Sequence, residues 1–213
     1  MEARSKGERA FRALAVSSLA AVLLAATPSR AQDPWVVPAL VEDPDWDRFS
    51  VCYDNGCTSV AQLGFTGAER DAIRAILEPA APDAAAEREQ LRAAVAQIER
   101  FVGARTGTSR DRGGTFNFVD DPQMDCIDES TNTTTYLAML RRNGLLRHHD
   151  VAEPATRGWF VFGWPHSTAV VRERASGAYW AVDSWFLDNG EPPFILPLEV
   201  WRRGWRPEDP VAD

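Results

Sequence analysis

Lysine is almost absent from this chain of 213 residues, because Lys6 is the only one. Histidine and cysteine are also scarce, with three residues of each type. Proteins that bind a phosphate backbone or an anionic membrane do so through clustered Lys and Arg side chains. Since the formal net charge is −8, neither nucleic acid nor an anionic membrane is an expected partner. The few histidines and cysteines leave a short list of candidates for acid–base or nucleophilic chemistry.

Apolar runs long enough to cross a membrane are also missing. The run Leu14–Ala26 falls short of the roughly 20 residues that a spanning helix needs. Basic residues precede this run and Ala31 closes a small-x-small site after it, an order typical of a cleaved secretory signal peptide. Cleavage removes five of 23 basic and two of 31 acidic side chains, so 18 and 29 remain and the mature net charge is −11. We therefore expect a periplasmic or secreted protein whose mature form does not bind the membrane.

Two of the three cysteines lie close together in the sequence. Cys52 and Cys57 flank Tyr53-Asp54-Asn55-Gly56, in which Asn-Gly favours a tight turn. A disulfide between them is expected in an exported protein. The alternatives are two free thiols or half of a zinc site, and the zinc site needs two further ligands that the neighbouring sequence lacks. Residues 32–65 around this turn are rich in Pro and Trp and are expected to form an extended arm.

Two helices are predicted to follow the arm. The first, Ala68–Leu77, has Thr66 at the N-cap and Glu69 at the capping-box position. The second, about Asp83–Ala104, has an apolar stripe at spacings of three and four residues, typical of a helix that packs on one face. The stripe consists of Leu91, Val95, Ile98 and Val102. The Glu and Arg residues of this helix are interpreted as a solvated face.

A third helix is predicted to begin at the remaining cysteine, Cys126. Asp125 lies at the N-cap with Asp128 three residues on, an approximate capping box, and Asn143-Gly144 ends the helix after about Arg142. Free backbone N–H groups and the helix dipole favour a thiolate in the first turn. We expect Asp125 and Asp128 to cap the backbone rather than to face the sulfur. A lone cysteine is otherwise most often an inert buried side chain.

The C-terminal half changes to a β pattern. Strands are predicted at Trp159–Trp164, His166–Arg172 and Tyr179–Phe186, separated by Pro165 and by a turn at Ser176-Gly177. Helices followed by an antiparallel sheet predict an α+β fold in which the helix that bears Cys126 packs on the sheet. The expected parts are a signal peptide at 1–31, an arm with the Cys52–Cys57 turn at 32–65, and one domain at 66–213.

A histidine and an aspartate fall on neighbouring predicted strands. Asp183 lies among apolar residues and is costly to bury without a hydrogen-bonded partner. Because side chains alternate along strands, a four-residue loop that pairs Glu173 with Ala178 places Thr168 opposite Asp183. His166 then lies one diagonal step from Asp183, within hydrogen-bonding reach. A thiol nucleophile needs a base and the base needs an orienting group, so Cys126, His166 and Asp183 are candidate catalytic residues.

Other residues compete for parts of this role. His148 and His149 are alternative bases, although tandem histidines at this place are most often surface or edge residues. Gln123 lies three residues before Cys126 and is a candidate side-chain donor to an oxyanion, together with the Cys126 backbone N–H. The alternative for Gln123 is an ordinary loop residue.

The order of a helix-borne cysteine, a strand-borne histidine and a strand-borne aspartate resembles the transglutaminase-like superfamily of papain-related cysteine enzymes. It is particularly similar to bacterial transglutaminase-like cysteine proteinases. The resemblance covers about residues 121–187 and is carried by Gln123-Met124-Asp125-Cys126-Ile127-Asp128-Glu129, Pro165-His166-Ser167-Thr168-Ala169-Val170-Val171 and Trp180-Ala181-Val182-Asp183-Ser184-Trp185. It implies that Cys126 is the nucleophile, His166 the general base and acid, and Asp183 its orienting residue. Met124 departs from the family pattern, which has glycine there.

The resemblance implies an exported amide hydrolase or acyl transferase that works through a thioester. A protein, peptide or cell-wall amide is the expected substrate, with no cofactor. Some proteinases of this type bind calcium through nearby acids, which makes Asp121, Asp125, Asp128 and Glu129 candidate ligands. No hard-cation loop motif is visible, so no metal is predicted. The alternative from another class is an inactive module that binds a peptide or glycan in the periplasm, using some of the C-terminal tryptophans as a cleft wall.

Overall fold

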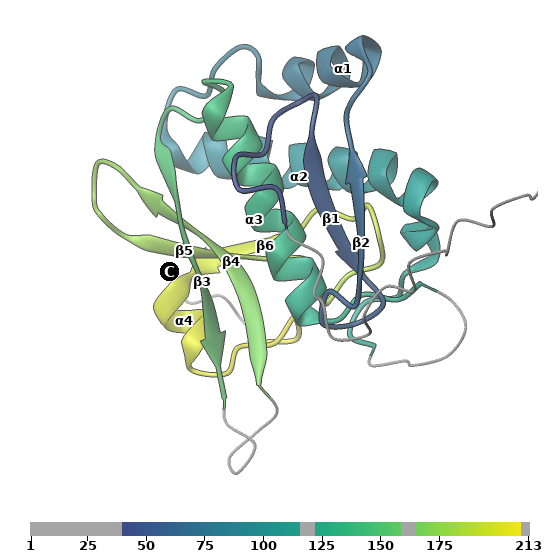
Figure 1. Ribbon diagram of the computed structural model, residues 1–213. Coiled ribbons are helices and arrows are strands. Elements are labelled where there is room, and N and C mark those ends of the chain that lie inside the picture. The colour runs from purple at the N-terminus through teal and green to yellow at the C-terminus, as the bar shows by residue number, and fades with distance from the viewer. Residues whose placement is uncertain (1–39, 116–121, 159–164, 210–213) are drawn as a thin grey trace, which may run out of the picture. The chain divides into compact units, whose positions relative to one another are not determined.

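The computed structural model describes residues 40–115, 122–158 and 165–209 (Figure 1). The expected signal peptide, the predicted strand Trp159–Trp164 and the candidate ligand Asp121 lie outside the described residues. All the described residues belong to one folded unit that spans Val37–Asp213. Among them, no helix combines the length and the apolar character needed to span a membrane.

The expected arm contains a β-hairpin. Strands β1 (Phe49–Tyr53) and β2 (Ser59–Leu63) pair antiparallel, and the Cys52–Cys57 turn joins them. Phe49 and Val51 of β1 are fully buried and belong to the same hydrophobic cluster as Phe65 and the helices. The hairpin is therefore part of the core of the domain, and the boundary expected at residue 66 does not separate two packing units.

The two helices that follow lie close to their predicted ranges, and a side-chain cap begins each of them. Helix α1 (Gly67–Leu77) has the Thr66–Glu69 capping box, and helix α2 (Ala84–Thr106) has Asp83 as its N-cap. The predicted apolar stripe of α2 is buried and consists of Leu91, Val95, Ile98 and Val102. A short 3₁₀ turn, η1 (Thr108–Arg110), follows α2.

The interpretation of the α2 acids as a solvated face is wrong for Glu87 and Glu99. Both side chains are buried. Glu87 lies four residues before Leu91 and Glu99 four residues after Val95, so both extend the apolar stripe of the helix. The spacing of the two residues therefore predicts that they are buried, whereas their charge favours an exposed position.

Helix α3 (Cys126–Arg142) is the predicted third helix, with Asp125 as its N-cap and Asn143 as its C-cap. Its first turn has the predicted capping box between Asp125 and Asp128. The helix packs against β1 on one side and against β3 and β4 on the other (Figure 1). Through these contacts the hairpin and the sheet both determine the position of Cys126.

The second sheet has four antiparallel strands in the order β3-β4-β5-β6. They are β3 (His149–Arg157), β4 (His166–Glu173), β5 (Tyr179–Asp183) and β6 (Phe194–Pro197). The fold is therefore α+β, as the sequence predicts. Strands β3 and β6 were not expected, and β5 ends three residues earlier than predicted because the chain turns after Asp183. A bulge interrupts β3 between Ala152 and Ala155.

Both faces of this sheet are covered. Ala169, Val171 and Val182 pack into the cluster formed with the helices and the hairpin. Val170 and Ala181 pack on the opposite side, where a second cluster includes Leu198, Trp201 and Trp205 of helix α4 (Leu198–Arg202) and the turn after it. The C-terminal segment therefore packs back over this face of the sheet. This second cluster lies beside the candidate histidine and aspartate.

Candidate active site

The backbone around Cys126 is fixed by the caps of α3. The Oδ1 atom of Asp125 accepts hydrogen bonds from the N–H groups of Ile127, at 2.9 Å, and Asp128, at 3.0 Å. In return, Oδ2 of Asp128 accepts from the N–H of Asp125 at 3.3 Å. The expectation that both acids cap the backbone is confirmed. These reciprocal bonds hold the residues on both sides of Cys126.

The Cys126 thiol is 5% exposed, and its Sγ atom lies 3.9 Å from the carbonyl oxygen of Pro165. Burial raises the pKa of this thiol, and the charges of Asp125 and Asp183 raise it further, whereas a hydrogen bond from the Ser167 N–H lowers it. The net direction is upward, opposite to the lowering expected from the helix terminus. The resting sulfur is therefore protonated at neutral pH and needs a base before it can act as a nucleophile.

His166 and Asp183 lie together as the strand register predicts. Strands β4 and β5 pair Arg172 with Tyr179, which is the register expected from the four-residue loop. The Nε2 atom of His166 is 2.7 Å from Oδ2 of Asp183, and both side chains are buried. The predicted histidine–aspartate hydrogen bond is confirmed. It leaves Nδ1 as the ring nitrogen that can exchange a proton.

Aromatic rings surround the imidazole of His166. Its centroid lies 4.8 Å from that of Trp185, 5.1 Å from that of Phe186 and 5.5 Å from that of Trp201. The indole N–H of Trp201 also donates to Oδ2 of Asp183, at 2.6 Å. The ring is thus packed on several sides and hydrogen-bonded through one nitrogen, which restricts its orientation.

The Cys126 thiol contacts the backbone next to His166 and forms no hydrogen bond with the imidazole. Cys126 contacts the backbone on both sides of His166, at Pro165 and Ser167. Among the described residues, however, the buried Nδ1 atom of His166 has no hydrogen-bond partner. The structure therefore pairs His166 with Asp183 and places the Cys126 sulfur beside β4. The hydrogen bond between this sulfur and Nδ1 of His166, through which a proton would pass, is not formed.

Gln123 has a clear structural position. Its Oε1 atom accepts hydrogen bonds from the Arg112 N–H at 3.0 Å and from the Thr115 hydroxyl at 3.1 Å. Its Nε2 atom donates to the carbonyl of Arg110 at 3.3 Å. The side chain thus ties the segment before Cys126 to the loop at residues 110–115. Among the described residues, the amide makes no second N–H donation, so the oxyanion role of Gln123 stays a prediction.

The alternative bases have other partners. His149 is fully buried rather than at the surface, and its Nδ1 atom is 2.9 Å from Oε1 of Glu87. His148 bonds the carbonyl of Ala81 through Nε2 at 3.0 Å. Glu87 also accepts the backbone N–H groups of Arg147 and of both histidines. This cluster fixes the entry of the chain into β3, so neither tandem histidine has a visible relation to Cys126.

The burial of several carboxyl groups around the start of α3 was not predicted from the sequence. Burial raises the pKa of Glu99, Asp111 and Asp128 to about 7 in each case, and raises that of Glu129 well above its usual value. Asp111 accepts the N–H of Met124 at 2.7 Å, and Asp128 accepts that of Cys57 at 2.6 Å. These acids hold backbone N–H groups around the nucleophile-bearing turn.

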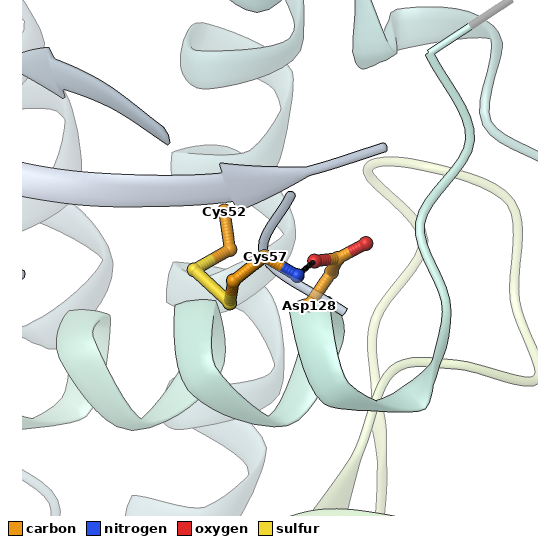
Figure 2. Close-up of side chains that lie close together, drawn as sticks. All are labelled: Cys52, Cys57 and Asp128. Carbon is orange, nitrogen blue, oxygen red and sulfur yellow. Dashed lines mark hydrogen bonds between the residues drawn. A yellow bond between two sulfur atoms is a disulfide. The ribbon is translucent and has the colours of Figure 1, made fainter. Parts of the chain in front are cut away.

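The predicted disulfide between Cys52 and Cys57 is present. The carboxylate of Asp128 lies against it, so that the ligand atoms of these three residues are all within 4.8 Å of one another (Figure 2). The structure thus supplies a third metal-ligating group that the local sequence lacks, but both sulfurs are used in the covalent bond. Among the described residues, Asp125, Asp128 and Glu129 do not converge on a shared cation site.

Met124, at the position where the sequence resemblance implies a glycine, is buried. Its sulfur lies 3.5 Å from Nδ2 of Asn132, one helical turn or more along α3 from the nucleophile. The same amide group also donates to the Cys52 carbonyl, so Met124 lies close to the contact between the hairpin and the helix.

Comparisons with protein-family models, with curated proteins and with solved structures found no match to this chain. The geometry of Cys126, His166 and Asp183 is consequently the basis on which a function is proposed.

Proposed function

We propose that this protein is an exported cysteine-dependent amide hydrolase or acyl transferase with a papain-like core, in which Cys126, His166 and Asp183 act together. The observation that carries the proposal is the buried hydrogen bond of 2.7 Å between His166 and Asp183, beside the strand that the Cys126 thiol contacts. A buried carboxylate that binds one imidazole nitrogen and leaves the other free is the arrangement of an oriented general base.

In the proposed reaction, Nδ1 of His166 removes the proton of the Cys126 thiol, and the sulfur attacks an amide carbonyl. The resulting imidazolium is stabilised by Asp183 and protonates the leaving amine as the C–N bond breaks. The product of this half-reaction is a thioester on Cys126. Water, activated by the neutral imidazole, then releases the acid and restores the thiol; an amine in place of water gives acyl transfer.

The unmade contact between sulfur and imidazole is compatible with this scheme. Catalytic hydrogen bonds are often long before substrate binds and tighten in the complex. A rotation about the Cα–Cβ bond of Cys126 moves the sulfur without moving the helix. The oxyanion is expected to be stabilised by the backbone N–H of Cys126 in the first turn of α3, and by Gln123.

A second candidate function is supported by the raised pKa of the Cys126 thiol. A protonated sulfur without a hydrogen bond to a base is also what a non-catalytic module would have. Such a module would bind a peptide or glycan in the periplasm without cleaving it. The two candidates differ in the reactivity of Cys126, which can be measured without knowledge of the substrate.

The experiment compares the wild-type protein with Cys126→Ala and His166→Gln on pools of peptides, proteins and cell-wall fragments, with products identified by mass. The enzymatic proposal predicts new products with the wild type alone, together with alkylation of Cys126 that depends on pH and on His166. His148→Gln is the matched control and should behave as the wild type. Slow alkylation that is identical in wild type and His166→Gln, without products, would support the binding module.

A further inference from the structure

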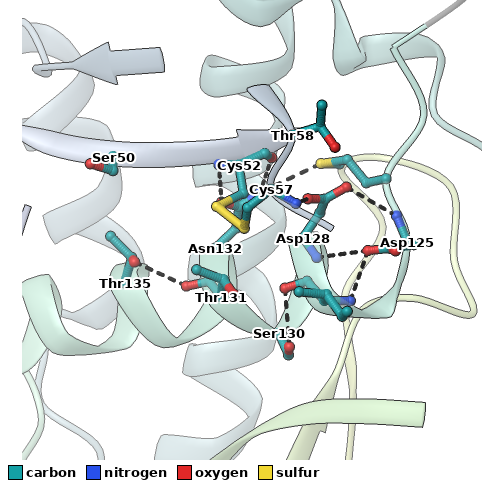
Figure 3. Close-up of a disulfide and its surroundings, with 12 residues drawn as sticks. Ser50, Cys52, Cys57, Thr58, Asp125, Asp128, Ser130, Thr131, Asn132 and Thr135 are labelled. Atoms are coloured by element: carbon teal, nitrogen blue, oxygen red, sulfur yellow. Dashed lines mark hydrogen bonds between the residues drawn. A yellow bond between two sulfur atoms is a disulfide. The ribbon is translucent and has the colours of Figure 1, made fainter. Parts of the chain in front are cut away.

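The disulfide-closed hairpin is docked directly on the first two turns of the helix that bears Cys126 (Figure 3). The N–H of Cys52 donates to Oδ1 of Asn132 at 2.7 Å, and Nδ2 of Asn132 returns a bond to the Cys52 carbonyl at 2.8 Å. The N–H of Cys57 donates to Oδ1 of Asp128 at 2.6 Å. Asp128 and Asn132 are four residues apart and therefore lie on one face of α3. Each half of the disulfide thus has its own partner on the helix.

Asp128 connects this docking contact to the nucleophile. Its side chain is fully buried and uses both oxygens, Oδ1 for the N–H of Cys57 and Oδ2 for that of Asp125. Asp125 is the residue before Cys126 and caps the helix in return. The backbone N–H of Asn55, in the same loop, also bonds Asp128. A displacement of the loop would therefore take donors away from a buried carboxyl group, which is a costly state. The caps beside Cys126 would then rearrange.

The loop between the two cysteines has an unusual backbone conformation, which the covalent bond helps to hold. Four consecutive residues have positive φ, with values of 66° at Asp54, 63° at Asn55, 67° at Gly56 and 55° at Cys57. Residues with a Cβ atom are disfavoured in this region, and Cys57 has no local side-chain hydrogen bond to favour it. Opening the disulfide would remove this constraint, and a change of φ at Cys57 would move its N–H away from Asp128.

We propose that Asp128 is a positioning residue for Cys126 and that the Cys52–Cys57 disulfide holds it in place, so that reduction of this disulfide lowers the reactivity of Cys126. The inference rests on the proposed function, since it concerns the same nucleophile. The reductant is a dithiol: it gives two electrons and two protons to the disulfide, the S–S bond breaks into two thiols, and the dithiol becomes its own cyclic disulfide.

The test measures the alkylation rate of Cys126 by iodoacetamide from pH 5 to pH 10, with the modified residue identified by peptide mass. The dithiol-reduced wild type and the double variant Cys52→Ser/Cys57→Ser are compared with the oxidised wild type. A chelator is present throughout, because two free thiols beside Asp128 could trap zinc. We expect a loss of about tenfold in rate at neutral pH and a rate profile displaced to higher pH.

Two single variants separate positioning from general stability. Asp128→Asn keeps an oxygen for the N–H of Cys57 but replaces the second acceptor oxygen with an NH₂ group. Its Cys126 alkylation rate should therefore fall less than that of Asp128→Ala. Thr58→Val removes a bond of 2.7 Å to the Asn55 carbonyl inside the same hairpin, without a contact to α3, and should leave the rate unchanged. Circular dichroism below the unfolding temperature establishes that each variant is folded.

The outcomes are distinguishable from those of the proposed function. If the folded double variant and Asp128→Ala keep the wild-type rate and pH profile, the positioning role is overturned, whether or not the wild type cleaves amides. If the rates differ as expected but the wild type yields no products from any pool, the positioning role stands and the enzymatic proposal fails. Equal amide cleavage by oxidised and fully reduced wild type would also overturn the inference.

Discussion

Trp201 donates its indole N–H to Oδ2 of Asp183 at 2.6 Å, and this is the oxygen that also binds His166. Arg157 contacts Trp201 in two ways. Its guanidinium lies 4.4 Å from the centroid of the indole ring and donates a hydrogen bond to the Trp201 backbone carbonyl. The carboxylate that orients the imidazole is therefore positioned by a helix beyond the sheet. This relationship gives a prediction that does not depend on the substrate.

Trp201→Phe should weaken the orientation of Asp183 while keeping most of the apolar volume. A hydrogen bond to a charged group contributes about 1.5–3 kcal/mol, so we expect a loss of tenfold or more in the reactivity of Cys126. Trp205→Phe is the control, because that indole N–H bonds the Asp209 carbonyl instead. If both variants lose reactivity equally, Trp201 acts through packing alone.

Gln123→Glu tests the oxyanion role. The new side chain keeps an oxygen for Arg112 and Thr115 but loses the amide N–H groups. Removal of one oxyanion donor typically lowers kcat by about 10²–10³-fold, with little effect on KM. Turnover of any substrate found in the pools is the measurement. If the variant has an unchanged kcat and a lower unfolding temperature, Gln123 stabilises the loop and has no oxyanion role.

The buried carboxyl groups predict a protein that is more stable in mild acid. Burial raises the pKa of Glu99, Asp111 and Asp128 to about 7, above the value of about 4 that such groups have when unfolded. The folded state then binds more protons, so the free energy of unfolding falls as pH rises from 4 to 7. Urea unfolding at pH 5, 6, 7 and 8 measures this slope.

A single substitution should reduce that pH dependence. Asp111→Asn keeps an acceptor for the N–H of Met124 and removes one titrating group, so the slope between pH 5 and pH 7 should become shallower. The exposed Asp43 provides the matched control, since Asp43→Asn changes the net charge equally. A slope that Asp111→Asn leaves unaltered would mean that this carboxyl does not titrate in the range.

Glu87 is expected to matter for stability and not for reactivity. Its carboxylate accepts three backbone N–H groups and the ring of His149, so Glu87→Ala should cost about 3 kcal/mol or more in the free energy of unfolding. Alkylation of Cys126 in the folded variant should follow the wild-type pH profile. If the pH profile of Cys126 alkylation changes in this variant, His148 and His149 again become candidates for the general base.

The sequence predicts a structural feature best where the interacting residues are close in the chain, or where the repeat of a helix or strand determines which side chains share a face. The helix starts at Thr66, Asp83 and Asp125 follow from side chains that bond N–H groups two or three residues away. The pairing of His166 with Asp183 follows from a short loop and the alternation of strands.

The missed strands share a physical cause. β3 and β6 are the two edges of their sheet, so they bury fewer side chains and have no clear alternation of apolar and polar residues. The contact of Cys57 with Asp128 spans 71 residues and has no local signature at all. The direction of the Cys126 pKa likewise depends on burial by distant segments, which outweighs the helix terminus that the sequence reveals.

The bulge in β3 has a consequence for how molecules of this protein meet in solution. Glu153 and Pro154 lie exposed within it, on a strand whose outer side is unpaired among the described residues. A charged side chain and a residue without an N–H make a poor template for a strand from another chain. The open edge of the sheet is thereby protected from intermolecular β-pairing, and concentrated solutions of the folded protein should resist fibril formation.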